Sequence, residues 1–249
     1  MIKLKSTEEI KRIRESCRLL AETHREIEKI VEPGISTLEL DRFAHDYIIR
    51  HGGKPAFLNY MGYPASLCTS VNQVVIHGIP NKKPLQAGDI ISLDLGIDLN
   101  GYFSDAARTL PVGKIAAEAE ELIHVTRESL YRGISQVKVG NRISHISRAV
   151  HDHAVGHGYG VVREYCGHGV GYSQHEDPQI PNYVSRGVNP RIRAGMVLAI
   201  EPMINQWSGD VVLLDDDWTV ETADGGLSAH WEHTVAVFED HAEILTEID

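Results

Sequence analysis

The sequence lacks the features of several specialised protein classes. Its three cysteines, Cys17, Cys68 and Cys166, are too few and too widely spaced for a disulfide framework or a paired zinc motif. No stretch approaches the roughly 18 uninterrupted apolar residues that a membrane helix needs, and the start of the chain lacks the apolar core of a signal peptide. These absences predict a cytoplasmic protein that does not associate with membranes.

The sequence is also short of positive charge. Its 249 residues include 24 Lys and Arg against 35 Asp and Glu, which gives a formal net charge of −11. This excess repels phosphate backbones and anionic lipids, so it argues against direct nucleic-acid readout and against a lipid-surface protein. What is present is typical of a globular protein, with 42% hydrophobic and 24% charged residues. Because no Ser/Pro-rich linker or run of like charge divides the chain, we predict a single domain over residues 1–249.

Hydrophobic periodicity predicts an α+β fold with elements in the order αα-ββ-αα-ββ. Two Ser-x-x-Glu capping boxes, at Ser6 and Ser36, mark the beginnings of the first two helices. The predicted helices are the stretch from Ser6 to Pro33, the stretch from Ser36 to Gly52, 116–137 and 143–155. The predicted strands lie within 67–76, 89–110, 161–165, 196–201, 211–214 and 231–238. This order indicates two similar halves, although no residue-level repeat supports them.

Residues 91–105 predict a β-hairpin that carries two carboxylates. Asn100-Gly101 between two alternating runs is typical of a type I′ turn. With this two-residue loop, facing residues have numbers that sum to 201, so Asp94 and Asp105 are diagonal neighbours on one face. A solvated polar face is the alternative interpretation. Against it, two neighbouring carboxylates repel each other unless a cation lies between them.

Two glutamates lie at the ends of strongly apolar strands. The continuous apolar run 196–200 ends in Glu201, and Glu232 begins the strand-like run that ends at Phe238. A carboxylate in such a place is costly unless it is paired or bound to a metal. For either glutamate alone, a structural salt bridge is the simpler interpretation.

His168 and His175 belong to a glycine-rich segment. Two glycines flank His168 and leave its imidazole accessible. The segment lacks the Lys-Ser/Thr pair and the spacing of a phosphate loop, so nucleotide binding has weak support. His175-Glu176 does not begin an HExxH zinc helix, because position 179 is Gln.

The other notable histidines favour simpler roles. His77 ends an apolar strand just before a turn, where a lone histidine is more often structural than catalytic. His153 and His157 share one helix face close to His151, but no carboxylate at matching spacing joins them. We therefore expect this helix to face solvent rather than to hold a metal.

Taken together, these segments resemble the methionine aminopeptidases, in particular the short bacterial type I enzymes. The spacings that match are 11 residues from Asp94 to Asp105, 7 from His168 to His175 and 31 from Glu201 to Glu232. The strings that match are His77-Gly78-Ile79-Pro80, Gly167-His168-Gly169-Val170-Gly171, His175-Glu176-Asp177-Pro178, Ile200-Glu201-Pro202-Met203 and Glu232-His233-Thr234. Each string is a weak motif, but five of them in the family's order over nearly the whole chain are very specific.

The resemblance implies the pita-bread fold, with two pseudo-symmetric halves around a central antiparallel sheet. It also implies a site with two divalent metal ions per chain, whose five ligands are Asp94, Asp105, His168, Glu201 and Glu232. Asp105 and Glu232 would bridge the ions, Asp94 would complete the sphere of one, and His168 with Glu201 that of the other. Such an oxygen-rich set without thiolates suits Mn, Fe, Co or Zn, and the sequence does not decide between them.

The resemblance also assigns catalytic and substrate-binding roles. Glu201 would relay a proton from the attacking water to the leaving amine, and His77 and His175 would contact the substrate and stabilise the tetrahedral intermediate. The methionine pocket maps onto Tyr60, Tyr63, Cys68 and Trp218. Gln174 departs from the family, where a bulky apolar residue often stands before this histidine. We expect Gln174 to line the pocket and to make one wall more polar or more open, so that Gln174→Phe would tighten the binding of methionyl peptides.

The implied activity is removal of an initiator methionine from peptides or nascent chains whose second residue is small. Association with the ribosome and a monomeric state follow from the same resemblance. One alternative is a prolidase or aminopeptidase P, which shares the five-ligand pattern but normally carries a sizeable N-terminal domain, whereas the family unit starts here within the first dozen residues. The other alternative is a non-catalytic binding module on the same fold, against which the intact ligand set argues.

Overall fold

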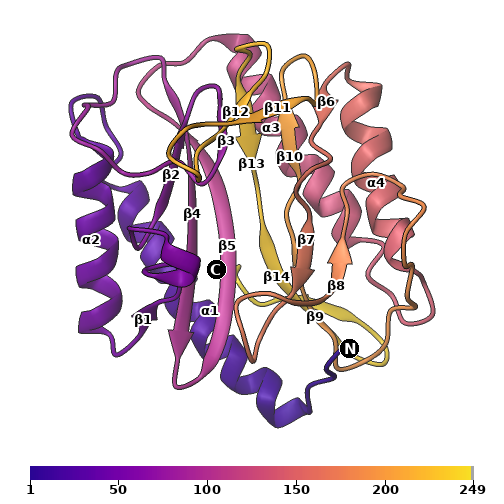
Figure 1. Ribbon diagram of the computed structural model, residues 1–249. Coiled ribbons are helices and arrows are strands. Elements are labelled where there is room, and N and C mark those ends of the chain that lie inside the picture. Colours follow the sequence, from indigo (N-terminus) through magenta and orange to yellow (C-terminus); the bar gives the residue numbers. More distant parts are fainter. Residues whose placement is uncertain (248–249) are drawn as a thin grey trace.

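Two groups of antiparallel strands meet at the centre of the molecule, and a pair of helices packs beside each of them (Figure 1). This computed structural model describes residues 1–247. The helices are α1 (Thr7–Glu28), α2 (Thr37–Arg50), α3 (Ala117–Ile134) and α4 (Ile143–Gly156), with a single 3-10 turn, η1 (Tyr60–Gly62). Within the described residues, no helix has the length and apolar character needed to cross a membrane.

The strands are short except for one long hairpin. The strands of the first half are β1 (Lys54–Pro55), β2 (Cys68–Val71), β3 (Val74–Ile76), β4 (Ile90–Leu99) and β5 (Tyr102–Pro111). Those of the second half are β6 (Gly160–Val161), β7 (Gly167–Gly169), β8 (Glu176–Ile180), β9 (Val197–Ile200), β10 (Met203–Asn205), β11 (Val211–Leu213), β12 (Val220–Thr222), β13 (Ser228–His230), β14 (His233–Val237) and β15 (Ala242–Ile244). The mixed helix-and-sheet architecture is the α+β class that the sequence predicts.

All four predicted helices are present, and both capping boxes form as predicted. Ser6 and Ser36 each accept a hydrogen bond from the backbone of the glutamate three residues on, and that glutamate side chain accepts from the serine backbone. The predicted strand 161–165 is largely wrong, since only Gly160–Val161 pairs with β10. Beyond Val161 the chain leaves the sheet, because the polar pair Arg163 and Glu164 lies at the surface.

The long hairpin β4–β5 has the predicted register. Asp94 pairs with Ala107 and Gly96 with Asp105, so the numbers of facing residues sum to 201. Asn100 and Gly101 both have positive φ, 55° and 83°, as a type I′ turn requires. The two aspartates therefore share one face of the hairpin, while the opposite face buries Leu95 and its neighbours under α1 and α2.

The two halves are joined at the centre through β5. The Thr234 hydroxyl of β14 donates to the Asp105 carbonyl at 2.7 Å and accepts from the Asp105 N–H at 3.1 Å. Next along, the Glu232 N–H donates to the Ala107 carbonyl at 2.9 Å. Each half has its own apolar core, one beneath α1 and α2 and one beneath α3. The polar residues at this junction consequently come from both halves.

Candidate active site

Five side chains from different strands converge where the halves meet. Asp94 comes from β4, Asp105 from β5 and His168 from β7, while Glu201 follows β9 and Glu232 precedes β14. Their ligand atoms, together with that of His175, form three groups within which all atoms lie within 4.8 Å of one another. The groups are Asp94, Asp105 and Glu232; His168, Glu201 and Glu232; and Asp105, His168 and His175. The structure thus brings together all five residues that the sequence singles out.

Three carboxylate oxygens of this cluster have no hydrogen-bond donor among the described residues. They are Asp94 Oδ1, Asp105 Oδ1 and Glu232 Oε1, and all three are buried. Burial, and then the Asp105 carboxylate beside them, raise the pKa of Asp94 and of Glu232 well above their usual values. Buried carboxylates in this arrangement are stabilised by a cation. Four carboxylates and one imidazole without a thiolate fit a divalent ion that prefers oxygen ligands.

His168 presents the correct nitrogen to the cluster. Its Nδ1 lies 3.0 Å from the Gly169 carbonyl, which accepts hydrogen bonds only, so Nδ1 carries the proton. Its Nε2 lies 3.4 Å from Glu201 Oε1 and 3.5 Å from Asp105 Oδ2. A histidine that donates from one nitrogen to a backbone carbonyl keeps the other free for a metal.

His230 is a member of the site that sequence reasoning missed. Its buried Nε2 lies 3.4 Å from Glu201 Oε2. Burial alone would raise the pKa of Glu201, but His230 and His168 outweigh it and lower the pKa below the usual value. The available signal was its position two residues before Glu232 on an extended segment, which places both side chains on one side.

A cavity of about 170 Å³ opens beside the cluster. Its lining comprises Phe57, Tyr60, Met61, Tyr63, Cys68, His77, Asp94, Asp105, His168, His175, Glu201, Trp218 and Glu232. The predicted pocket residues Tyr60, Tyr63, Cys68 and Trp218 are among them. Sequence reasoning missed Phe57 and Met61, which no motif marks. The apolar part of this cavity has room for an unbranched, flexible side chain.

Two histidines that line the cavity are not among the five candidate ligands. His77 directly follows β3 with a positive φ of 58°, which turns its ring toward Trp218 at 6.1 Å between centroids. The Tyr60 hydroxyl and His175 Nδ1 are 2.8 Å apart. Burial lowers the pKa of both histidines to about 4, so each is neutral near pH 7. With Tyr60 donating to Nδ1, His175 keeps an N–H on Nε2.

Comparison with known proteins agrees with this geometry. The family model described as "Metallopeptidase family M24" matches residues 11–239. A methionine aminopeptidase of Clostridium perfringens is 50% identical over 248 residues, which span 100% of both chains. This chain belongs to the methionine aminopeptidase family. The crystal structure of a methionine aminopeptidase from Rickettsia prowazekii superposes with a TM-score of 0.97 at 41% identity, covering 99% of this chain and 100% of that one.

The fold prediction is confirmed by the same comparisons, because this family has the pita-bread architecture. The Xaa-Pro dipeptidase of Bacillus anthracis has the same fold, with a TM-score of 0.79 at 22% identity. The present chain covers 62% of that dipeptidase, against 100% of the Rickettsia enzyme. The likeness to methionine aminopeptidases is therefore the closer one in identity, fold and length.

Gln174 does not lie where we expected it. Its side chain is buried and is not part of the cavity wall that Tyr60 and Trp218 form. It lies in the loop before β8, where its Nε2 donates to Asp105 Oδ2 at 2.5 Å. The prediction that Gln174 makes the methionine pocket polar is wrong, because the amide bonds to Asp105 while the next residue, His175, lines the cavity.

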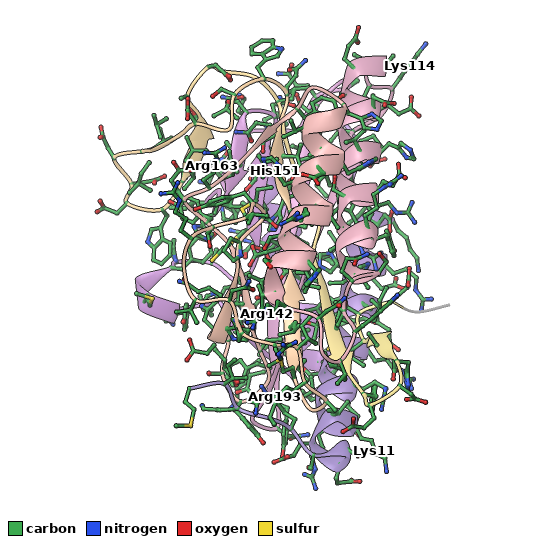
Figure 2. All side chains as sticks on the ribbon, turned by 90° about the vertical axis from the view of Figure 1, so that its right-hand side faces the viewer. Lys11, Lys114, Arg142, His151, Arg163 and Arg193 are labelled. Atoms are coloured by element: carbon green, nitrogen blue, oxygen red, sulfur yellow. The ribbon has the colours of Figure 1, made fainter. Side chains whose placement is uncertain are left out.

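The helix histidines lie apart from the site. His151 is on the outer face of α4, near Arg163 (Figure 2). His153 does not face solvent as predicted, since its side chain is only 7% exposed and its Nε2 lies 3.3 Å from Glu128 of α3. His157 stacks edge-on against it at 4.6 Å. In the described part of the chain, no third ligand joins these residues in a metal-holding group.

Proposed function

We propose that this chain removes N-terminal methionine from peptides and nascent proteins whose second residue is small, and that residues 1–249 act as one catalytic domain. The observation that carries the proposal is the juxtaposition of the acidic cluster with the cavity of Phe57, Tyr63 and Trp218. Such a cavity suits a thioether side chain. The substrate's scissile bond then lies beside Asp105, Glu201 and Glu232.

The cluster would hold two divalent ions, with Mn, Fe, Co and Zn as candidates. Asp94 would bind one ion, and His168 with Glu201 the other. Asp105 and Glu232 would contribute to the binding of both ions, which is supported by the occurrence of each residue in two of the three ligand groups. When bound, the ions supply Lewis-acid activation of the scissile carbonyl and of the attacking water.

The chain's own side chains supply the proton transfers and the orientation. Glu201 accepts a proton from the attacking water and delivers it to the leaving amine. The Nε2–H of His175, fixed by the Tyr60 hydroxyl, donates to the developing oxyanion, and His77 holds the substrate from the opposite wall. A single donor in this role is worth roughly 10²–10³ in rate.

The preference for a small second residue follows from crowding. His77, His175 and Glu201 line both the methionine cavity and a larger adjoining cavity of about 660 Å³. The second residue of the substrate would lie between the methionine cavity and the larger cavity, where the imidazoles of His77 and His175 would leave little space for its side chain. The remainder of the polypeptide would extend through the larger cavity.

The protein would act at the ribosome, because its substrate is the nascent chain. It would do so as a monomer. Although the net charge is −11, Arg142 just before α4, His151 of α4 and Arg163 after β6 lie on one side of the molecule (Figure 2). The arginines on this side support salt-dependent contact with RNA phosphates without sequence readout.

A panel of Met-X-Ser tripeptides, assayed with each metal in turn, tests the proposal. We expect rapid hydrolysis of Met-Ala-Ser and slow hydrolysis of Met-Leu-Ser, with no activity after chelation. Equal rates on the two peptides would contradict the small-residue preference. Efficient cleavage of Xaa-Pro dipeptides without methionine would instead support a prolidase.

A further inference from the structure

Gln174 is a buried polar residue that the proposed reaction does not use. Its side chain lies at 1% exposure directly behind the ligand residue Asp105. Its Nε2 donates to Asp105 Oδ2 at 2.5 Å, and its Oε1 has no hydrogen-bond partner within residues 1–247. A primary amide in such a place is costly unless its bond to the carboxylate compensates.

The orientation of this amide follows from the chemistry of its neighbour. An ionised carboxylate only accepts hydrogen bonds, so the N–H side of Gln174 faces Asp105 Oδ2. That oxygen also lies 3.5 Å from His168 Nε2, on the side of the cluster formed by His168 and Glu201. Asp105 Oδ1, in contrast, has no partner within the described residues. Gln174 therefore fixes one oxygen of the carboxylate and leaves the other free.

The backbone makes room for this contact. Gly96 faces Asp105 across the hairpin, and a Cβ at Gly96 would lie 2.8 Å from Gln174 Oε1 and 2.7 Å from the Phe57 ring. A side chain at position 96 would thus displace the amide. The glycine of β4 and the glutamine of the loop before β8 together form one supporting unit behind Asp105.

We propose that Gln174 is a positioning residue for the metal centre, which sets the plane of the Asp105 carboxylate through an N–H···O bond; this inference rests on the proposed metal site. Outer partners of metal ligands orient those ligands, and their loss typically costs about 10–100-fold in metal affinity. The effect would fall on the ion held by the ligand group that contains Asp105 and His168, because the Asp105 oxygen that accepts the bond is the one near His168 Nε2.

Titration of the metal-free protein with Co²⁺, followed by calorimetry and by the visible absorption of the bound ion, tests this. Gln174→Met keeps the length of the side chain and removes the donor. We expect its affinity for one of two ions to fall by about 10–100-fold, with a changed Co²⁺ spectrum. Gln86→Met, the same substitution at an exposed position before β4, is the matched control and should bind Co²⁺ like the unsubstituted protein.

Kinetics separate this role from one in the substrate pocket. For Met-Ala-Ser, Gln174→Met should lower kcat and leave KM unchanged at saturating metal, because the side chain does not line the methionine cavity. Should Gln174→Met fail to fold, Gln174→Asn keeps an amide that is one methylene too short to reach Asp105, and the same loss of Co²⁺ affinity is expected.

Unchanged Co²⁺ affinity in the folded variant would overturn the positioning role, as would a change confined to KM. Failure of the proposed function would look different. In that case the unsubstituted protein would cleave no methionyl peptide with any metal, while the Co²⁺ titrations of the variants would still decide whether Gln174 supports the site.

Discussion

At the scale of single residues, Glu232 is one of the side chains on which the candidate metal centre depends. It is 1% exposed, and it belongs to two of the three ligand groups. Its Oε1 has no hydrogen-bond partner in the described part of the chain. An unpartnered buried carboxylate destabilises the metal-free fold but favours a bound cation. This residue therefore lowers the stability of the metal-free protein while it raises the affinity for the metal.

Glu232→Gln should separate the effect on metal affinity from the effect on the stability of the metal-free protein. The amide keeps the shape of the side chain but removes its negative charge, so metal affinity and the rate of Met-Ala-Ser hydrolysis should fall together. The fall should exceed the roughly 100-fold loss that is the upper end for residues that only hydrogen-bond to a metal ligand. The metal-free variant should melt at the same temperature as the parent or higher, because a neutral amide avoids the cost of an ionised carboxylate at this buried position. Elemental analysis, kinetics and thermal melts measure the three quantities. Full metal occupancy with normal turnover would refute the assignment, and Glu221→Gln on β12, outside the three ligand groups, is the control.

Sequence reasoning identified the residues that the structure brings together, and it failed where the direction of a side chain matters. Two carboxylates on a predicted hairpin, two at the ends of apolar runs and a histidine between glycines were noted first, and the family resemblance joined them into one candidate ligand set. Gln174 and His230 were misplaced or missed, because what they contact depends on how a loop and a short strand turn beside β5. Such contacts join residues far apart in the chain, as the separation of 69 residues between Gln174 and Asp105 illustrates.

At the scale of elements, the hairpin β4–β5 aligns two candidate ligands through its turn. The period of two and the Asn100-Gly101 dipeptide were enough to predict its register, because both signals are local. The three-residue strand β7 was not predicted, since Gly167-His168-Gly169 carries no β pattern. Its extended form depends on pairing with β8, which follows it in the chain, and with β9, which begins at Val197.

Gly101→Ala should destabilise the protein through this turn. Gly101 has a φ of 83°, and a Cβ added there would meet no atom within 4 Å, so the cost is backbone strain of about 1–2 kcal/mol in the free energy of unfolding. Gly156, at the end of α4, has an ordinary φ and equally open surroundings. Gly156→Ala should therefore be neutral or stabilise by roughly 0.5–1 kcal/mol. Urea denaturation of both variants measures the difference, and equal effects would contradict the strained turn.

At the scale of the whole molecule, the two halves form one site because β5 bonds to the C-terminal half while its own half packs on α1. His24 of α1 contributes to this packing, since its Nε2 donates to the Ala106 carbonyl of β5 at 2.9 Å. That carbonyl belongs to the residue next to Asp105. Sequence periodicity could not predict how the helices pack on the central strands, because it identifies the buried face of a helix but not the element that covers this face.

Acid should weaken this docking in a defined pH range. Burial, and then Arg108, lower the pKa of His24 from 6.5 to about 3. Between these values the unfolded chain binds a proton that the folded chain does not, so the free energy of unfolding falls as the pH is lowered, by about 1.4 kcal/mol per pH unit from this group. His24→Gln keeps an N–H donor for Ala106 but does not titrate. The free energy of unfolding of this variant, measured in urea between pH 6.5 and 4, should therefore change with pH by about 1.4 kcal/mol less per pH unit than that of the parent. His124→Gln, on the exposed side of α3, is the control. An unchanged slope in His24→Gln would mean that proton uptake elsewhere in the molecule drives acid unfolding.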